Sequence, residues 1–236
     1  MMKLEKITVP APRELFVNSI LEKILSGELS IGEKLPNERE LAEETGLSRP
    51  VISAGIKTLV SQGFLTVKPR QGTFVADYKR EGTLDTLNAI LALRGDVLTN
   101  NEIRSILEIR WALEHLTMKN AIERITDKDL SRIRKITDDL KDAQTPQEAA
   151  ECCFAFQREL AVLGGNEILA LIMTSFRPPV IALWKRFCRK YGIRVLYEHT
   201  MRSFAFIAAR DYEGALRWLD LFTEDAISGD FTVYTD

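Results

Sequence analysis

The side chains best suited to binding an anion lie in one thirty-residue stretch of this 236-residue chain. Between Gly46 and Val75 the chain carries Arg49, Lys57, Lys68 and Arg70, and it has no aspartate or glutamate there. The whole chain is nearly neutral, with 32 Lys plus Arg against 34 Asp plus Glu. Cations without neighbouring carboxylates favour binding to nucleic-acid phosphates, because they release condensed counterions. The pattern predicts a nucleic-acid-binding surface that the net charge does not reveal.

A helix, a tight turn and a second helix are expected to position these cations. Asn37 can cap the first helix, and Glu40 follows three residues later, as in a capping box. Gly46 suits the left-handed residue that follows a helix end. Ser48 can cap the second helix, and Pro50 in its first turn sacrifices no hydrogen bond. The sequence therefore predicts a helix-turn-helix.

A small β-wing is expected after the second helix. Gly63 ends that helix, and the segments FLTV and TFV read as short strands on either side of PRQG. Two helices joined by a tight turn and followed by a hairpin make a winged helix-turn-helix, a shape that binds DNA. A winged helix that docks on a protein and has an incidental basic face is the alternative. The turn residues and the absence of acid together favour DNA.

The stretch from Leu35 to Val75 resembles the amino-terminal domain of the GntR family of bacterial transcription regulators. Its residues, LPNERELAEETGLSRPVISAGIKTLVSQGFLTVKPRQGTFV, follow the family's helix, turn, recognition helix and glycine-containing wing in order. The resemblance implies that Arg39 and Arg49 read guanines in the major groove, where arginine forms two parallel hydrogen bonds. It also implies that Gly72 lets the wing backbone approach the minor groove.

One position of the recognition helix departs from the family pattern. Ser53 stands where the family usually has a further arginine. A serine hydroxyl can reach a phosphate or a base edge, but it cannot make the two-pronged contact. We assign Lys57 and Arg70 to the same DNA-binding surface, because they belong to the acid-free stretch. The resemblance therefore implies DNA binding without transferring the operator sequence.

Chain length and composition predict two domains in a mostly α-helical protein. A length of 236 residues with 45% apolar content permits a core in each domain. We expect a winged helix-turn-helix domain over residues 1–77 and a polar linker over 78–83. Residues 84–236 are expected to form an antiparallel bundle of about seven helices, because apolar residues from Leu84 onward have helical spacing.

The sequence shows no signal for export or for membrane insertion. Residues 1–12 lack the apolar region of a secretory signal, and no stretch approaches the roughly 18 apolar residues of a membrane span. Cys152, Cys153 and Cys188 fit neither a disulfide framework nor a redox motif. We expect core thiols in a reducing cytoplasm and no membrane partner.

The helical region resembles the effector domain of the FadR-type GntR subfamily, which is the FCD domain or its fatty-acid-responsive relative. The R-x-x-x-E motif of the family falls on Arg110 and Glu114. The resemblance implies a domain that pairs two subunits and binds a small ligand. Further positions that match the family pattern are Phe156, Gln157, Leu160, Gly165, Asn166, Glu198, His199, Asp211 and Ala215.

The metal site of the FCD branch is not expected in this chain. By the resemblance its ligand positions fall on Cys153, Gln157, His199 and Phe222, so one aspartate and two of three histidines are replaced. One imidazole with a neutral amide and a phenyl ring is a poor ligand set for a transition metal. The chain's other histidine, His115, lies on a different helix. We therefore expect neither a metal nor another cofactor.

An effector pocket is expected instead, lined by Arg110, Gln157, His199 and Phe222. The relative that also lacks the metal, the fatty-acid regulator, binds long-chain acyl-CoA. The resemblance therefore implies acyl-CoA, a fatty acid or a small carboxylate, although core packing explains each aromatic residue taken singly. Arg110 lies at mid-helix among apolar residues and needs a partner. That partner is either a ligand anion or Glu114, one turn further on.

Together these patterns predict a repressor that binds a pseudo-palindromic DNA operator as a homodimer and responds to a small-molecule effector. A DNA-binding head fused to an enzyme would need a longer chain. No Ser-His-Asp, Cys-His or paired-carboxylate set has usable spacing. A helical domain that only dimerises, with a degenerate pocket that binds no ligand, stays open as the alternative.

Overall fold

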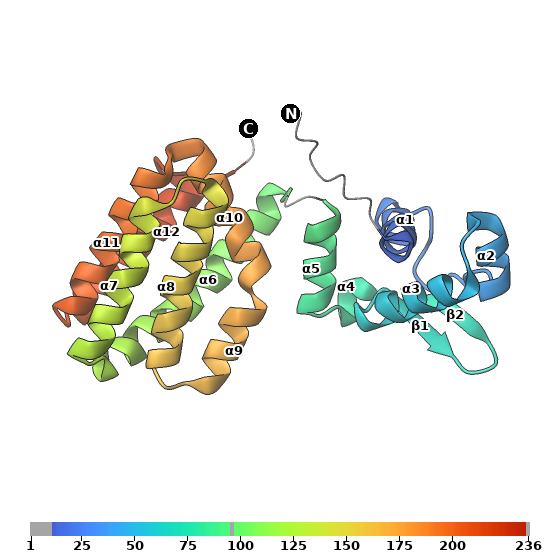
Figure 1. The fold of residues 1–236 in the computed structure, drawn as a ribbon, viewed down its shortest axis with the longest axis horizontal. Helices are drawn as coiled ribbons and strands as arrows, with labels where there is room; N and C mark the ends of the chain where they lie inside the picture. The colour runs from blue at the N-terminus through green and yellow to red at the C-terminus, as the bar shows by residue number, and fades with distance from the viewer. Residues whose placement is uncertain (1–10, 95–96, 235–236) are drawn as a thin grey trace, which may run out of the picture. The chain divides into compact units, whose positions relative to one another are not determined.

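The chain folds into two compact units, Met1–Gly95 and Asp96–Asp236. The computed structural model describes residues 11–94 and 97–234, and Figure 1 shows their helices and strands. The predicted fold class is confirmed, because the chain is mostly α-helical with one small sheet after a helix-turn-helix. The described elements of the first unit are α1 (Pro12–Ser26), α2 (Glu38–Thr45), α3 (Arg49–Ser61), β1 (Leu65–Lys68), β2 (Gly72–Val75), α4 (Tyr78–Glu81) and α5 (Leu84–Leu93).

The turn between α2 and α3 forms largely as the residues predict. The Asn37 side chain accepts hydrogen bonds from the backbone N–H groups of Arg39 and Glu40, at 3.0 and 3.1 Å. The Glu40 carboxylate accepts the Asn37 N–H at 2.9 Å, which completes the capping box. Gly46 follows α2 with a φ of 68° in the left-handed region. Ser48 takes the N-cap position of α3, but within residues 11–94 its hydroxyl accepts no capping hydrogen bond, so that prediction was wrong.

The wing is an antiparallel hairpin that is fixed to the segment before α2. In β1 and β2, Leu65 lies opposite Val75 and Lys68 lies opposite Gly72. The Leu35 N–H donates to the Thr73 carbonyl at 2.9 Å, and the Val75 N–H donates to the Glu33 carbonyl at 2.9 Å. Because both edges of β2 are hydrogen-bonded, the wing has a defined position on the helix-turn-helix.

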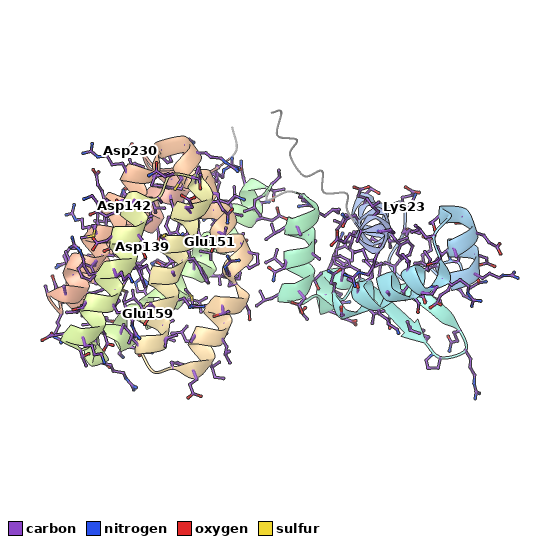
Figure 2. The ribbon with its side chains drawn as sticks, in the orientation of Figure 1. Lys23, Asp139, Asp142, Glu151, Glu159 and Asp230 are labelled. Carbon is purple, nitrogen blue, oxygen red and sulfur yellow. The ribbon has the colours of Figure 1, made fainter. Side chains whose placement is uncertain are left out.

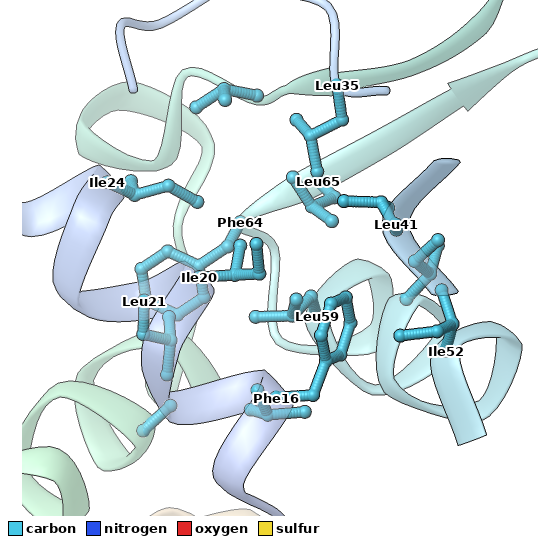
Figure 3. Close-up of a cluster of buried hydrophobic side chains, with 14 residues drawn as sticks. Phe16, Ile20, Leu21, Ile24, Leu35, Leu41, Ile52, Leu59, Phe64 and Leu65 are labelled. Atoms are coloured by element: carbon cyan, nitrogen blue, oxygen red, sulfur yellow. The ribbon is translucent and has the colours of Figure 1, made fainter. Parts of the chain in front are cut away.

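The core of the first unit joins α1 to the helix-turn-helix and the hairpin (Figure 3). The glycine at position 55 of α3 allows α1 to pack closely, because a methyl group there would overlap the Phe16 ring. Packing of this kind positions α3 by its buried side and leaves its other side for contacts outside the unit. The labelled core residues in Figure 3 are Phe16, Ile20, Leu21, Ile24, Leu35, Leu41, Ile52, Leu59, Phe64 and Leu65.

The boundary between the units lies further along the chain than the sequence suggested. Most of the expected linker over residues 78–83 is the short helix α4, and α5 belongs to the first unit, against α1. Ala89 of α5 lies in the core of that unit, and the Thr86 hydroxyl donates to the Gln62 carbonyl at 2.7 Å. Helical spacing identified α5, but it does not tell which of two cores its apolar side covers.

The second unit is a bundle of helices, as expected, within residues 97–234. Helix α8 packs against α6, α7 and α10, while α12 packs against α6 and α11 (Figure 1). The acidic side chains Asp139 and Asp142 of α7 are exposed (Figure 2). The described helices are α6 (Asn100–Arg124), α7 (Asp127–Asp142), α8 (Pro146–Leu163), α9 (Glu167–Ser175), α10 (Arg177–Tyr191), α11 (Ile193–Ala208) and α12 (Tyr212–Ser228).

Three helices of the bundle begin with the same local signal, a threonine followed three residues later by an acid. Thr99, Thr126 and Thr145 each accept a hydrogen bond from the backbone of that acid, at 3.2–3.3 Å, and the acid's carboxylate reaches back to the threonine N–H. The prolines at 178 and 179 lie in the first turn of α10, and α9 and α10 are separate helices bent by 60°.

No single helix of residues 11–94 and 97–234 is both long enough and apolar enough to cross a membrane. Helices α9 and α10 reach that length and composition only when they are taken together across their bend.

Candidate functional site

One side of α3 presents the predicted recognition residues to solvent. Arg49, Ser53 and Lys57 follow one another at intervals of four residues and therefore share a helix face. Arg49 and Lys57 are exposed and Ser53 is half-buried, whereas Ile52 and Leu59 on the other side are completely buried. We call this group (Arg49, Ser53 and Lys57) the basic face. It offers two cations and a hydroxyl in the arrangement by which a recognition helix contacts a major groove.

Arg39 is the fourth residue expected to contact DNA, and it projects from α2. Its Nε lies 3.8 Å from a carboxylate oxygen of Glu43, and both side chains are about two-thirds exposed. An exposed pair at this distance contributes little to stability. Arg39 can therefore exchange its carboxylate partner for a base edge or a phosphate at small cost.

The tip of the wing holds a cation in an unusual backbone conformation. The Gln71 N–H donates to the Lys68 carbonyl at 3.0 Å and closes a four-residue turn with Pro69 second and Arg70 third. Arg70 has a φ of 62°, a value that a turn of this type normally assigns to glycine or asparagine. A non-glycine residue in this backbone conformation costs about 1–3 kcal/mol of stability. The Arg70 side chain is exposed. Such an outlier supports a function for the Arg70 side chain.

Gly72 is required locally by the wing itself. Its φ is 124°, and a Cβ there would lie 2.8 Å from Cε of Lys34. Lys34 pairs with Phe74 across the sheet edge. The glycine therefore accommodates both the backbone turn and the Lys34 side chain, and an approach to a minor groove would be a second use of the same space.

A cavity inside the bundle brings together all four residues expected to bind an effector. Arg110, Gln157, His199 and Phe222 line it, from α6, α8, α11 and α12 respectively. Its volume is about 40 Å³. One water molecule needs roughly 10–15 Å³ on this measure, so the cavity has room for about three.

The polar side of the cavity is a buried, connected network. Nε of Arg110 lies 2.7 Å from Oε1 of Glu114, and Nε2 of Gln157 donates to the same oxygen at 2.6 Å. The guanidinium of Arg110 lies 4.2 Å from the ring centroid of Trp184, where cation–π attraction adds to the ion pair. Burial raises the pKa of Glu114 above its ordinary value, although Arg110 acts in the opposite direction. The sequence left Arg110 with two possible partners, and the structure pairs it with Glu114.

The apolar side of the cavity is a stack of rings around His199. Its imidazole contacts both Trp218 and Phe222 of α12, with ring centroids 5.0 and 4.4 Å away. Burial lowers the pKa of His199, so the ring is neutral at neutral pH. His199 therefore contributes a hydrogen-bonding atom and an aromatic surface to the cavity, but no charge.

The residues at the family's metal positions do not suit a metal. Burial raises the pKa of the Cys153 thiol well above its usual range, so it is not the thiolate that a metal needs. Gln157 is bonded to Glu114, and Phe222 has no donor atom. Within residues 11–94 and 97–234 no three His, Cys, Asp or Glu side chains are grouped for metal binding. Burial also raises the pKa of Cys188 to about 11, which makes it an unreactive core thiol.

The sequence alone did not reveal two features of the cavity. Trp184 stacks on Arg110, although the two residues are 74 positions apart in the sequence. Gln157 was placed at a lost metal position, yet its amide bonds Glu114. The R-x-x-x-E spacing was the one signal that pointed to part of this network.

A winged helix-turn-helix with a basic recognition helix, together with a helical domain that contains a cavity beside a buried ion pair, defines a DNA-binding transcription regulator. Comparison with known families agrees. Residues 14–75 match the family described as "Bacterial regulatory proteins, gntR family", and residues 105–223 match the FCD domain. The chain belongs to the GntR family and carries an FCD domain.

Similar proteins share this organisation. LutR of Bacillus subtilis, an HTH-type transcriptional regulator, is 27% identical over 88% of this chain and 97% of its own length. The B. subtilis regulator YcbG is 31% identical over 69% of this chain and 68% of its own length. A fatty acid metabolism regulator protein of Shewanella halifaxensis is 26% identical over 78% of this chain and 74% of its own length. These relatives are regulators, so the enzyme alternative is excluded.

A solved structure supports the fold. Lar, described as controlling expression of the Listeria monocytogenes agr system, superposes with a TM-score of 0.67 over 94% of this chain and 97% of its own. Its sequence identity is 16%, so the likeness concerns architecture alone.

Proposed function

We propose that this regulator binds a pseudo-palindromic operator as a homodimer and acts as a repressor in the cytoplasm, where bacterial DNA lies. Each subunit places its basic face in one major groove, with Arg49 and Arg39 on guanines. Lys57 and the wing residue Arg70 contact phosphates, and the backbone at Gly72 approaches the minor groove. The observation that supports this best is the basic face itself, exposed on one side of a helix whose other side is locked in the core.

We further propose that the cavity among α6, α8, α11 and α12 binds the effector. The supporting observation is that the four residues identified by family resemblance, which come from four different helices, line one cavity. Its volume of about 40 Å³ favours a small molecule over an acyl-CoA or a long fatty acid. To weaken operator binding tenfold, the effector must bind the two arrangements of the protein with affinities that differ by about 1.4 kcal/mol.

An electrophoretic assay on DNA from upstream of the protein's own gene tests the DNA-binding part. We expect a specific shift with the wild type and none with Arg49→Ala, while both proteins unfold at the same temperature. Arg217→Ala is the matched control, because Arg217 is an exposed arginine on α12 of the other unit. Normal binding by Arg49→Ala would contradict the docking of α3.

A helical domain that only dimerises is the second candidate, and the internal pairing of Arg110 with Glu114 favours it, because the buried cation already has its counter-ion. Thermal unfolding with acyl-CoAs, fatty acids and small carboxylates separates the two, since a ligand that binds the folded state raises its stability. Addition of a stabilising compound to the DNA assay then shows whether binding is coupled to the operator.

A further inference from the structure

Three residues that line the cavity each have a buried polar atom with no hydrogen-bond partner within residues 97–234. These atoms are Oε1 of Gln157, Nε1 of Trp184 and Nδ1 of His199. Gln157 is 7% exposed and Trp184 is 4% exposed, so bulk water does not satisfy them. A buried polar atom without a partner is costly, and native proteins rarely leave three of them around one cavity. These atoms can therefore serve as contact points for a bound molecule.

The unpartnered atoms define what such a molecule must offer. The Gln157 oxygen can only accept, so the molecule must carry an N–H or O–H donor. The Trp184 indole can only donate, so the molecule must also carry an acceptor. The neutral His199 ring can supply either role through Nδ1. A carboxylate meets the second requirement and fails the first.

The charges around the cavity limit the charge of the molecule. The ionisable groups that line it are Arg110, Glu114, Cys153 and His199. Nε of Arg110 lies 2.7 Å from the Glu114 carboxylate, so these two charges already neutralise each other and neither is left for a ligand ion. An ion added to this set would be buried without a counter-ion, which is strongly unfavourable. An uncharged molecule avoids that cost.

We propose that the cavity binds a small uncharged molecule with both a donor and an acceptor, of the size of a small carboxamide, and that it does so without a metal ion. This inference rests on the proposed effector role of the cavity. Its volume of about 40 Å³ matches a molecule of a few non-hydrogen atoms. The N–H of such a molecule donates to Gln157, its carbonyl accepts from Trp184, and its alkyl part lies against the His199–Phe222 rings.

Matched amide and acid pairs test the ligand class directly. Acetamide and propionamide are compared with acetate and propionate, which have the same shape and differ in charge and in the donor. Binding to the full-length protein is measured by calorimetry and by thermal shift, with and without EDTA. We expect each amide to bind at least about tenfold more tightly than its acid, with no effect of the chelator.

Two variants test the contact atoms, each with a matched control. Trp184→Phe removes the indole donor and keeps a ring, and Gln157→Leu removes the amide acceptor. Each should weaken amide binding about tenfold, whereas Trp111→Phe and Gln147→Leu, which alter exposed residues outside the cavity, should leave it unchanged. The comparison on the wild-type protein decides the question even if a variant folds poorly.

The outcomes separate this inference from the function proposed above. If the acids bind as well as the amides, the ligand class is wrong although the cavity remains an effector site. If EDTA abolishes binding, metal independence is wrong. If neither amides nor acids bind, the inference is wrong, while the operator assay with Arg49→Ala still tests DNA binding by itself.

Discussion

The two functional regions of this protein use arginine in opposite ways. On the basic face, Arg49 is exposed and its charge is open to an external anion. In the bundle, Arg110 is 3% exposed, paired with Glu114 and covered by Trp184. An exposed cation contributes little to stability and can bind an external anion. A buried cation is needed to neutralise its buried counter-ion, so its main role is in stability. Substitutions in the two regions should therefore affect different measurements.

The largest expected effect is on stability, from Arg110→Ala. The change leaves the buried Glu114 carboxylate without its cation, which should lower the free energy of unfolding by about 3–5 kcal/mol. Arg104→Ala is the control, because Arg104 and Glu108 form an exposed pair of the same spacing on the same helix, and little change is expected there. Urea unfolding of both variants measures the difference, and equal losses would contradict the distinction between buried and exposed pairs.

Arg49→Lys should affect DNA binding and leave stability unchanged. Lysine keeps the charge and loses the two parallel hydrogen bonds to guanine, at a cost of about 1–3 kcal/mol in specific binding. Binding to unrelated DNA should change much less. Fluorescence anisotropy with specific and unrelated duplexes measures both, and Arg217→Lys serves as the control. An equal loss on both duplexes would assign Arg49 to a phosphate.

Arg70→Gly should move stability and DNA affinity in opposite directions. Glycine adopts the φ of 62° without strain, so the free energy of unfolding should rise by up to about 1 kcal/mol. Operator affinity should fall, because a cation leaves the wing tip. Lys68→Ala, two residues earlier, should weaken DNA binding without the gain in stability. If Arg70→Gly destabilised the protein, the wing-tip conformation would not be strained.

The smallest expected effect is on the pH dependence of stability, through His199. Its pKa in the folded protein is lowered by burial, so below the ordinary value of 6.5 the unfolded chain binds more protons. The free energy of unfolding should therefore fall as the pH drops from about 7 to about 5. His199→Phe keeps the stack with Trp218 and should lose less stability over that range. Urea unfolding at the two pH values checks the sign.

The first unit shows what sequence patterns can and cannot define. The capping box at Asn37 and the turn at Gly46 depend on residues a few positions apart, so they were predictable. The place of α5 depends on contacts between Thr86 and Gln62, 24 residues apart in sequence, and on the packing of Ala89. Apolar spacing marks a helix as amphipathic without indicating its partner.

The cavity shows the same limit at the level of chemistry. Glu114 was a foreseeable partner of Arg110, because the two lie one helical turn apart. Trp184 could not be assigned to Arg110 from the sequence, since only the packing of α10 against α8 and α6 brings it there. The positive φ of Arg70 was equally invisible, because the turn favours glycine or asparagine at that position and the sequence has neither.

The position of α5 in the first unit has a practical consequence for building hybrid regulators. A head fragment ending at Asp77 would lack α5 and would uncover the part of α1 that packs against it. A junction placed after Arg94 keeps α5 and the complete hydrophobic core of the first unit in the DNA-binding fragment. Exchange of effector domains between GntR proteins of this type should therefore succeed at the later junction and yield poorly folded heads at the earlier one.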